Sequence, residues 1–158
     1  LGGNEMLSVG DKAPAFELPD ADMAMCLSQD LEGSNYVIYF YPKDDTPGCT
    51  MEAQEFSDLL DEFVAHNTKL IGVSKDNCKS HGEFRDKYGL TVQLLADVEG
   101  QLCDAYGVWQ EKEKNGEKKF GIVRSTFIVD AQGTIKFAEY GVSPKGHAEQ
   151  ILEVVRSF

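Results

Sequence analysis

Residues 36–50 read Tyr-Val-Ile-Tyr-Phe-Tyr-Pro-Lys-Asp-Asp-Thr-Pro-Gly-Cys-Thr and contain three structural signals in succession. The β-branched and aromatic residues over 35–41 predict a strand that is buried on both faces. Thr46 is a suitable N-cap and Pro47 suits the first position of a helix. Cys49 would then lie in the first turn of that helix, where free amides and the helix dipole favour a thiolate. The stretch therefore indicates a strand, a turn and a helix that carries a redox-active or nucleophilic cysteine.

The rest of the chain continues this alternation of strands and helices. The helix after Pro47 has apolar residues at helical spacing and is expected to end near His66. A second helix, capped by Asp76, is expected to run to about Tyr88. Further elements are predicted as a hairpin around 19–22, strands at 69–74, 92–96, 125–129 and 134–140, an exposed charged hairpin or loop at 111–119, a short helix at 101–106 and a C-terminal helix. The pattern predicts an α/β fold with a mixed central sheet flanked by helices on both faces.

The composition and charge of the chain argue against several classes of function. The chain has 158 residues, with 27 acidic and 15 basic side chains and a net charge of −12. This acidity argues against nucleic acid or an anionic membrane as a partner, and no apolar stretch is long enough to span a bilayer. The first residues have neither the basic nor the apolar segment of a signal peptide, so a cytoplasmic protein is expected. We interpret residues 1–5 as a cloning remnant or a disordered start and residues 6–158 as one domain.

The chain has four cysteines, Cys26, Cys49, Cys78 and Cys103. No pair has Cys-x-x-Cys spacing, and no cysteine and histidine cluster has the spacing of a zinc site. With no signal peptide, the thiols are expected to be reduced at rest. Cys103 is expected to be a buried structural thiol and Cys26 to be passive. The three histidines are scattered and predicted to lie on the surface.

The segment around Cys49 resembles a known enzyme family. Pro42, Thr46 and Cys49 match the Pro-x-x-x-Thr-x-x-Cys motif of the peroxiredoxins. The flanking residues are similar to those of the peroxiredoxin Q subfamily, also called bacterioferritin comigratory proteins. Residues 10–20 resemble the N-terminal segment of the family, and residues 106–109 and 124–130 resemble its later landmarks, so the likeness runs from about residue 6 to the end. It implies a thioredoxin-like fold and a thiol peroxidase for hydrogen peroxide and organic hydroperoxides, with no metal, haem or flavin.

The resemblance also implies roles for five residues. Cys49 is the peroxidatic cysteine, which attacks the peroxide and becomes a sulfenic acid. Thr46 hydrogen-bonds the peroxide and the thiolate, and Pro42 shields the thiolate. Arg124 is the cation that completes the site, and Glu52 can hold this arginine. Thioredoxin or glutaredoxin is the expected reductant, and a monomer or weak homodimer is the expected state.

A second, resolving thiol is not at the positions that the family uses most often. The residue five positions after Cys49 is Gln54, and Gly82 and Arg85 also lack a thiol. Cys78 precedes Gly82 by one helical turn, so it would share a face with that position. Two mechanisms remain open at this point. Cys78 resolves the sulfenic acid after a local unfolding of a helix end, or an external thiol reduces it directly.

Two other functions also use a reactive cysteine. A thiol–disulfide oxidoreductase could have the same fold, but the chain lacks the Cys-x-x-Cys motif of those enzymes. A redox sensor or holdase would signal through Cys49 oxidation without catalytic turnover. Failure to reduce insulin disulfides would reject the first, and slow oxidation without renewal would favour the second.

Overall fold

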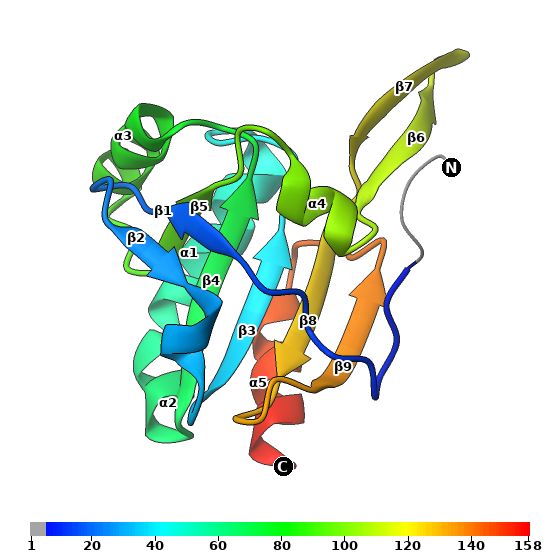
Figure 1. Cartoon of the computed structure of the whole chain (residues 1–158). Helices are drawn as coiled ribbons and strands as arrows, with labels where there is room; N and C mark the ends of the chain where they lie inside the picture. Colours follow the sequence, from blue (N-terminus) through cyan, green and yellow to red (C-terminus); the bar gives the residue numbers. More distant parts are fainter. Residues whose placement is uncertain (1–5) are drawn as a thin grey trace.

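The computed structural model describes residues 6–158 (Figure 1), so the remnant or disordered start expected at residues 1–5 lies outside the described residues. Its centre is a five-stranded sheet in the order β5-β4-β3-β8-β9. Strands β3, β4 and β5 are parallel, whereas β8 and β9 run antiparallel to their neighbours. The predicted mixed sheet is therefore confirmed. The strands are β3 (Asn35–Phe40), β4 (Thr68–Ser74), β5 (Gln93–Ala96), β8 (Ser125–Val129) and β9 (Ile135–Tyr140).

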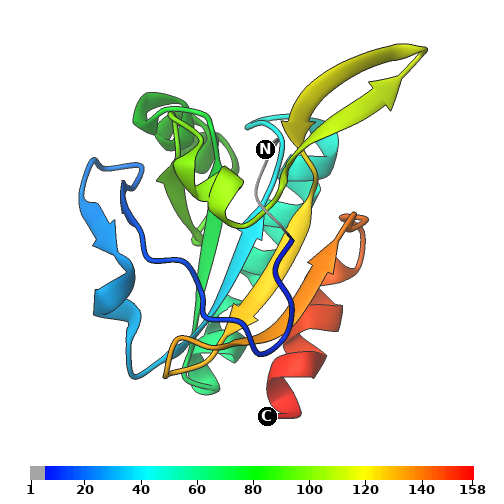
Figure 2. The ribbon, with the colours of Figure 1, turned by 45° about the vertical axis from the view of Figure 1, so that its right-hand side comes forward.

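Helices lie on both faces of this sheet, as predicted (Figures 1 and 2). One face is covered by α1 (Pro47–Asp58), α2 (Leu60–Ala65) and α5 (His147–Arg156), with α3 (Cys78–Tyr88) beside them. The other face carries the short helices α4 (Gln101–Ala105) and η1 (Ser28–Leu31). None of the helices within residues 6–158 has the length and apolar character needed to cross a bilayer.

Strand β3 packs against both layers because its side chains alternate. Val37 and Tyr39 belong to the apolar cluster under α1 and α5, together with Cys49. Ile38 and Phe40 belong to the cluster under α4. All four of these β3 side chains have no exposed surface, which is why nearly every residue of this strand is apolar or aromatic.

Two antiparallel hairpins extend from the main sheet. The first joins β1 (Glu17–Pro19) to β2 (Met25–Leu27), which confirms the turn predicted at 19–22. The second joins β6 (Trp109–Lys114) to β7 (Glu117–Ile122) and projects from the body of the molecule (Figure 2). The charged segment 111–119 is thus an exposed hairpin.

Two helix boundaries differ from the sequence-based predictions. The helix after Pro47 ends at Asp58, and a separate helix begins at Leu60, so the single helix predicted to reach His66 is wrong. Leu59 interrupts it, since its amide donates back to Phe56 in a tighter i to i−3 turn. The apolar residues keep their helical spacing across Leu59, so the sequence pattern did not reveal the break between the two helices.

The second difference concerns the start of α3. Asn77, not Asp76, is the N-cap: its Oδ1 accepts a hydrogen bond from the Ser80 amide at 2.8 Å. The Asp76 carboxylate instead accepts from the Asp44 amide and the Ser74 hydroxyl. Both residue types are good N-caps, and a tertiary contact decides between them.

The histidines also depart from expectation. His66 is exposed, as predicted. His81 has no exposed surface and His147 only 2 %, so the prediction of surface histidines is wrong for these two. Cys103, in contrast, is fully buried, which confirms that prediction.

Candidate active site

Cys49 lies in the first turn of α1, directly after the loop that leaves the carboxyl end of β3. The first helical hydrogen bond runs from the Thr50 amide to the Thr46 carbonyl at 2.8 Å. The amides of Gly48 and Cys49 precede it and have no acceptor within the helix. Cys49 itself is only 2 % exposed. The environment predicted for Cys49 from the local sequence is therefore present.

Arg124 joins Cys49 from a distant part of the chain. Its Nη2 lies 3.4 Å from Cys49 Sγ, and its Nη1 lies 2.7 Å from Glu52 Oε1. Ser125 of β8 pairs with Phe40 of β3, so the residue before β8 lies beside the loop that follows β3. The antiparallel pairing of β8 with β3 thus places the Arg124 guanidinium beside the Cys49 sulfur. The structure brings Cys49, Glu52 and Arg124 together as one cluster.

Burial changes the ionisation of this cluster. Glu52 has no exposed surface, and burial raises its pKa from 4.5 to about 7, with Arg124 offsetting part of the rise. Burial also lowers the pKa of Arg124, but the charges of Glu52 and Cys49 outweigh it and the net shift is upward. The guanidinium therefore stays charged, whereas the carboxyl can exist in either form near neutral pH.

Gly48 allows the close approach of Arg124. A Cβ atom at position 48 would lie 3.1 Å from Arg124 Nη2 and 3.4 Å from Pro144 Cγ. Any larger residue would push the guanidinium away from the sulfur next to it. The absence of a side chain at position 48 thus leaves the room that Arg124 occupies beside the sulfur.

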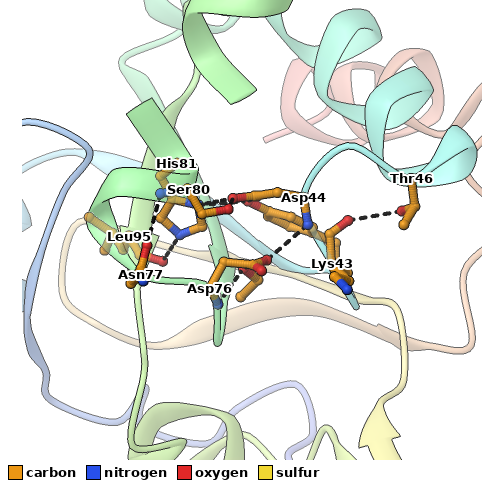
Figure 3. A network of polar contacts seen from close by, with 10 residues as sticks. Lys43, Asp44, Thr46, Asp76, Asn77, Ser80, His81 and Leu95 are labelled. Atoms are coloured by element: carbon orange, nitrogen blue, oxygen red, sulfur yellow. Dashed lines mark hydrogen bonds and ion pairs between the residues drawn. The ribbon is translucent and has the colours of Figure 1, made fainter. Parts of the chain in front are cut away.

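Thr46 and Pro42 lie in the same loop but do not contact the sulfur through a hydrogen bond. The Thr46 hydroxyl donates to the Lys43 carbonyl at 2.9 Å (Figure 3). Thr46 is the N-cap of α1 by its backbone, but its side chain makes no capping hydrogen bond. Pro42 is exposed at the start of the loop.

A buried polar network holds this loop against α3 (Figure 3). Asp44 Oδ1 accepts from the Tyr41 hydroxyl at 2.6 Å, and Oδ2 accepts from the Ser80 hydroxyl at 2.7 Å and lies 2.8 Å from His81 Nδ1. The Asp44 amide donates to Asp76 at 2.8 Å. The sequence analysis missed this network, because partners more than thirty residues apart leave no signal in local spacing.

The next residue ties the loop to the other end of the same helix. Asp45 accepts hydrogen bonds from Lys87 at 2.8 Å and from the Tyr88 hydroxyl at 2.5 Å. Adjacent aspartates therefore fasten the loop to both ends of α3. Cys78, the candidate resolving cysteine, is the first residue of this helix and is partly exposed.

The network also contains a cluster with the composition of a metal site. Ligand atoms of Asp44, Asp76 and His81 lie within 4.8 Å of one another. All three side chains are already engaged in hydrogen bonds with each other or with their neighbours. The cluster is satisfied by protein groups, and its chemistry is that of a structural clamp.

Cys26 and Cys103 lie in surroundings that disfavour a thiolate. Burial and the nearby Asp97 raise the pKa of Cys103, which disfavours its thiolate. Burial and the acids Asp20 and Asp30 raise the pKa of the half-buried Cys26. Neither environment favours nucleophilic attack.

Comparisons with known proteins identify the family of the chain. The model of the AhpC/TSA family matches residues 9–138. A curated relative from Helicobacter pylori, named putative peroxiredoxin bcp, is 42 % identical over 149 residues, covering 94 % of this chain and 98 % of that protein. The structure of a Xylella fastidiosa PrxQ mutant superposes with a TM-score of 0.92 at 35 % identity, covering 98 % of both chains.

A second solved structure carries functional information in its name. It is the Xanthomonas campestris bacterioferritin comigratory protein, described in relation to alkyl peroxide reduction activity, with a TM-score of 0.86 at 37 % identity over 90 % of both chains. The expected thioredoxin-like fold is confirmed by these likenesses. The chain therefore belongs to the AhpC/TSA family, as a peroxiredoxin of the Bcp or PrxQ type.

Proposed function

We propose that this peroxiredoxin reduces hydrogen peroxide and organic hydroperoxides through Cys49. The observation that carries the proposal is the position of Cys49 Sγ, 3.4 Å from the guanidinium of Arg124 and in the first turn of α1. A fixed cation and a helix N-terminus both stabilise a thiolate, the form that attacks a peroxide. The alkyl peroxide activity named for the Xanthomonas relative supports organic hydroperoxides as substrates.

The reaction begins with in-line attack of the Cys49 thiolate on one peroxide oxygen. An S–O bond forms, the O–O bond breaks, and hydroxide or alkoxide leaves and takes up a proton. Arg124 and the amides of Gly48 and Cys49 stabilise the charge that moves onto the departing oxygen. Thr46 turns its hydroxyl toward the peroxide, and Pro42 shields the thiolate from bulk water before it becomes a sulfenic acid.

A second thiol then reduces the sulfenic acid. The adjacency of α3 to the Cys49 loop supports Cys78 as this thiol, after its helical turn unwinds. An external thiol such as thioredoxin or glutaredoxin completes the cycle. The proposed enzyme is one domain of residues 6–158, and it is a cytoplasmic monomer or weak homodimer. If Cys78 does not react, the external thiol acts directly on Cys49.

The test is peroxide consumption at steady state with thioredoxin and its reductase, for the wild type and Cys49→Ser. The variant is expected to lose turnover, whereas Cys26→Ser, which removes a thiol with a raised pKa, is expected to keep it. Turnover in Cys49→Ser would overturn the proposal. A single oxidation of Cys49 that no thiol reductant renews would instead favour the sensor or holdase function.

A further inference from the structure

Glu52 is an unusual group beside the reacting sulfur because solvent does not reach it. It follows Cys49 by three residues on α1, so the two side chains share one helical face. Only one carboxyl oxygen, Oε1, has a partner, Arg124 Nη1 at 2.7 Å. The other, Oε2, is fully buried and has no hydrogen-bond partner within residues 6–158. An ionised oxygen in such a place is costly, and the neutral acid costs much less.

Arg124 favours an ionised Glu52, but it is shared with a second acid, and other negative charge lies nearby. Arg124 is a single cation that touches two acids, Cys49 Sγ at 3.4 Å and Glu52 Oε1 at 2.7 Å. Glu55 on the same helix adds a further negative charge that raises the pKa of Glu52. Tyr39 of β3 stays neutral, because burial raises its pKa well above 10. Ionising both Cys49 and Glu52 would leave a net negative charge in a buried cluster.

Groups from two other elements approach the cluster. For His147, the first residue of α5, burial and the charge of Arg124 lower the pKa to about 4, so it is neutral near pH 7. The pKa of Lys112 of β6 is lowered mainly by burial and further by Arg124, whereas Cys49 raises it. Lys112 is a second cation near the thiolate, but its Nζ donates to the Ile122 carbonyl at 2.6 Å and not to Glu52.

We propose that Glu52 holds a proton while Cys49 is a thiolate and releases this proton when Cys49 is oxidised. The inference rests on the proposed peroxidase function. Oxidation to the sulfenic acid removes the negative charge next to Arg124, so the guanidinium then has Glu52 alone as its anionic partner. A pKa of about 7 for Glu52 supports this, because a modest change in the neighbouring charge shifts its proton occupancy at neutral pH.

The step balances in atoms and charge. The thiolate, one peroxide molecule and the Glu52 carboxylic acid become the sulfenic acid, one molecule of water or alcohol, and the Glu52 carboxylate. The sulfur loses two electrons to the peroxide, and the proton that Glu52 releases matches the proton that the departing oxygen takes up. Glu52 touches Arg124 and not the peroxide, so it is a positioning residue that also stores a proton.

Infrared difference spectra before and after one equivalent of hydrogen peroxide test this directly. The Cys78→Ser variant is used, so that the sulfenic acid does not become a disulfide. We expect a protonated-carboxyl C=O band to disappear on oxidation at pH 7, and carboxylate bands to replace it. The change should be absent in the Glu52→Gln variant and present in Glu83→Gln, a control at an exposed position of α3. A spectrum without any carboxyl change at pH 7 overturns the inference.

Proton uptake gives a second readout that a purely structural role would not move. In weakly buffered solution with a pH indicator, Glu52→Gln in the Cys78→Ser background should take up about one proton more per oxidised Cys49 than Cys78→Ser alone. The reason is that in Cys78→Ser this proton comes from Glu52. Equal uptake contradicts the inference. The Cys78→Ser variant also allows a pH test: about two pH units above the Glu52 pKa of about 7, the C=O change should vanish.

The failure of this inference can be told from the failure of the proposed function. Intact mass is measured on the same samples. If peroxide adds no oxygen to Cys49, the peroxidase function itself is wrong. If Cys49 gains one oxygen and the carboxyl band is unchanged, only the role of Glu52 is wrong.

Discussion

The imidazole Nδ1 of His81 and the carboxylate Oδ2 of Asp44 lie 2.8 Å apart. His81 Nε2 is 2.9 Å from the Leu95 carbonyl oxygen, which only accepts, so Nε2 carries a hydrogen. Nδ1 faces Asp44 Oδ2, a second acceptor. The His81 side chain has no exposed surface and that of Asp44 only 4 %. The pair therefore joins α3 to the Cys49 loop through a buried hydrogen bond.

Replacing Asp44 with Asn is expected to destabilise the fold by about 3 kcal/mol. The change turns one carboxylate oxygen into an NH2 donor, so the Tyr41 hydroxyl, the Ser80 hydroxyl and His81 Nδ1 are left with one acceptor oxygen in place of two. Urea denaturation followed by circular dichroism measures the loss. The matched control is Asp45→Asn, since Asp45 is exposed and is expected to contribute little. Equal stability of the Asp44→Asn variant and the wild type would show that the pair does not hold the loop.

Replacing Arg124 with Lys is expected to slow Cys49 oxidation by roughly 100-fold. One ammonium group cannot contact both Cys49 Sγ and Glu52 Oε1 as the two guanidinium nitrogens do. Stopped-flow measurement of the second-order rate constant with hydrogen peroxide gives the effect. Arg156→Lys, in a solvent-exposed ion pair at the end of α5, should leave the rate unchanged. A normal rate in Arg124→Lys would mean that any positive charge suffices at this position.

Cys78 is expected to form a disulfide with Cys49 once Cys49 has been oxidised. The reason is that α3 begins with Cys78 and is fastened to the Cys49 loop at both of its ends. Intact mass after one equivalent of peroxide, without reductant, is the measurement. The wild type should lose two hydrogens, and Cys78→Ser should gain one oxygen. A gain of one oxygen in both proteins would establish a one-cysteine mechanism.

His147 is expected to make the fold sensitive to acid. Burial lowers its pKa from 6.5 to about 4, so the unfolded chain binds a proton more readily than the folded one. Stability from this residue is present above pH 6.5 and falls as the pH drops toward 4, by on the order of 2 kcal/mol. His147→Gln should remove this loss, as measured by urea denaturation between pH 7 and pH 4.

The control for that measurement is His66→Gln, because His66 is exposed. Glu52 acts in the opposite sense, since its raised pKa favours the folded state at low pH and that contribution is lost as the pH rises through 7. The comparison of each variant with the wild type cancels this common effect. The same acid dependence in His147→Gln and the wild type would contradict the prediction.

Local sequence determined most of the secondary structure. The alternation of apolar strands and amphipathic helices, together with Pro47 at a helix start, predicts the mixed sheet and the place of Cys49. It failed at Leu59 and at Asp76, where a backbone turn and a long-range hydrogen bond fix the helix boundary. Both boundaries depend on contacts that periodicity does not contain.

In the candidate site, too, some features could be predicted from the local sequence and others depend on tertiary contacts. The sequence by itself singled out Cys49 as the candidate nucleophile, because the loop, the proline and the helix dipole act within a few residues of Cys49. Arg124 was assigned only through a resemblance, since it lies 75 residues away and reaches the sulfur through the pairing of β8 with β3. The tertiary structure alone decided the burial of Glu52 and His81. Burial is a property of how layers pack, and it sets whether a polar side chain is solvated or must find its partner inside the protein.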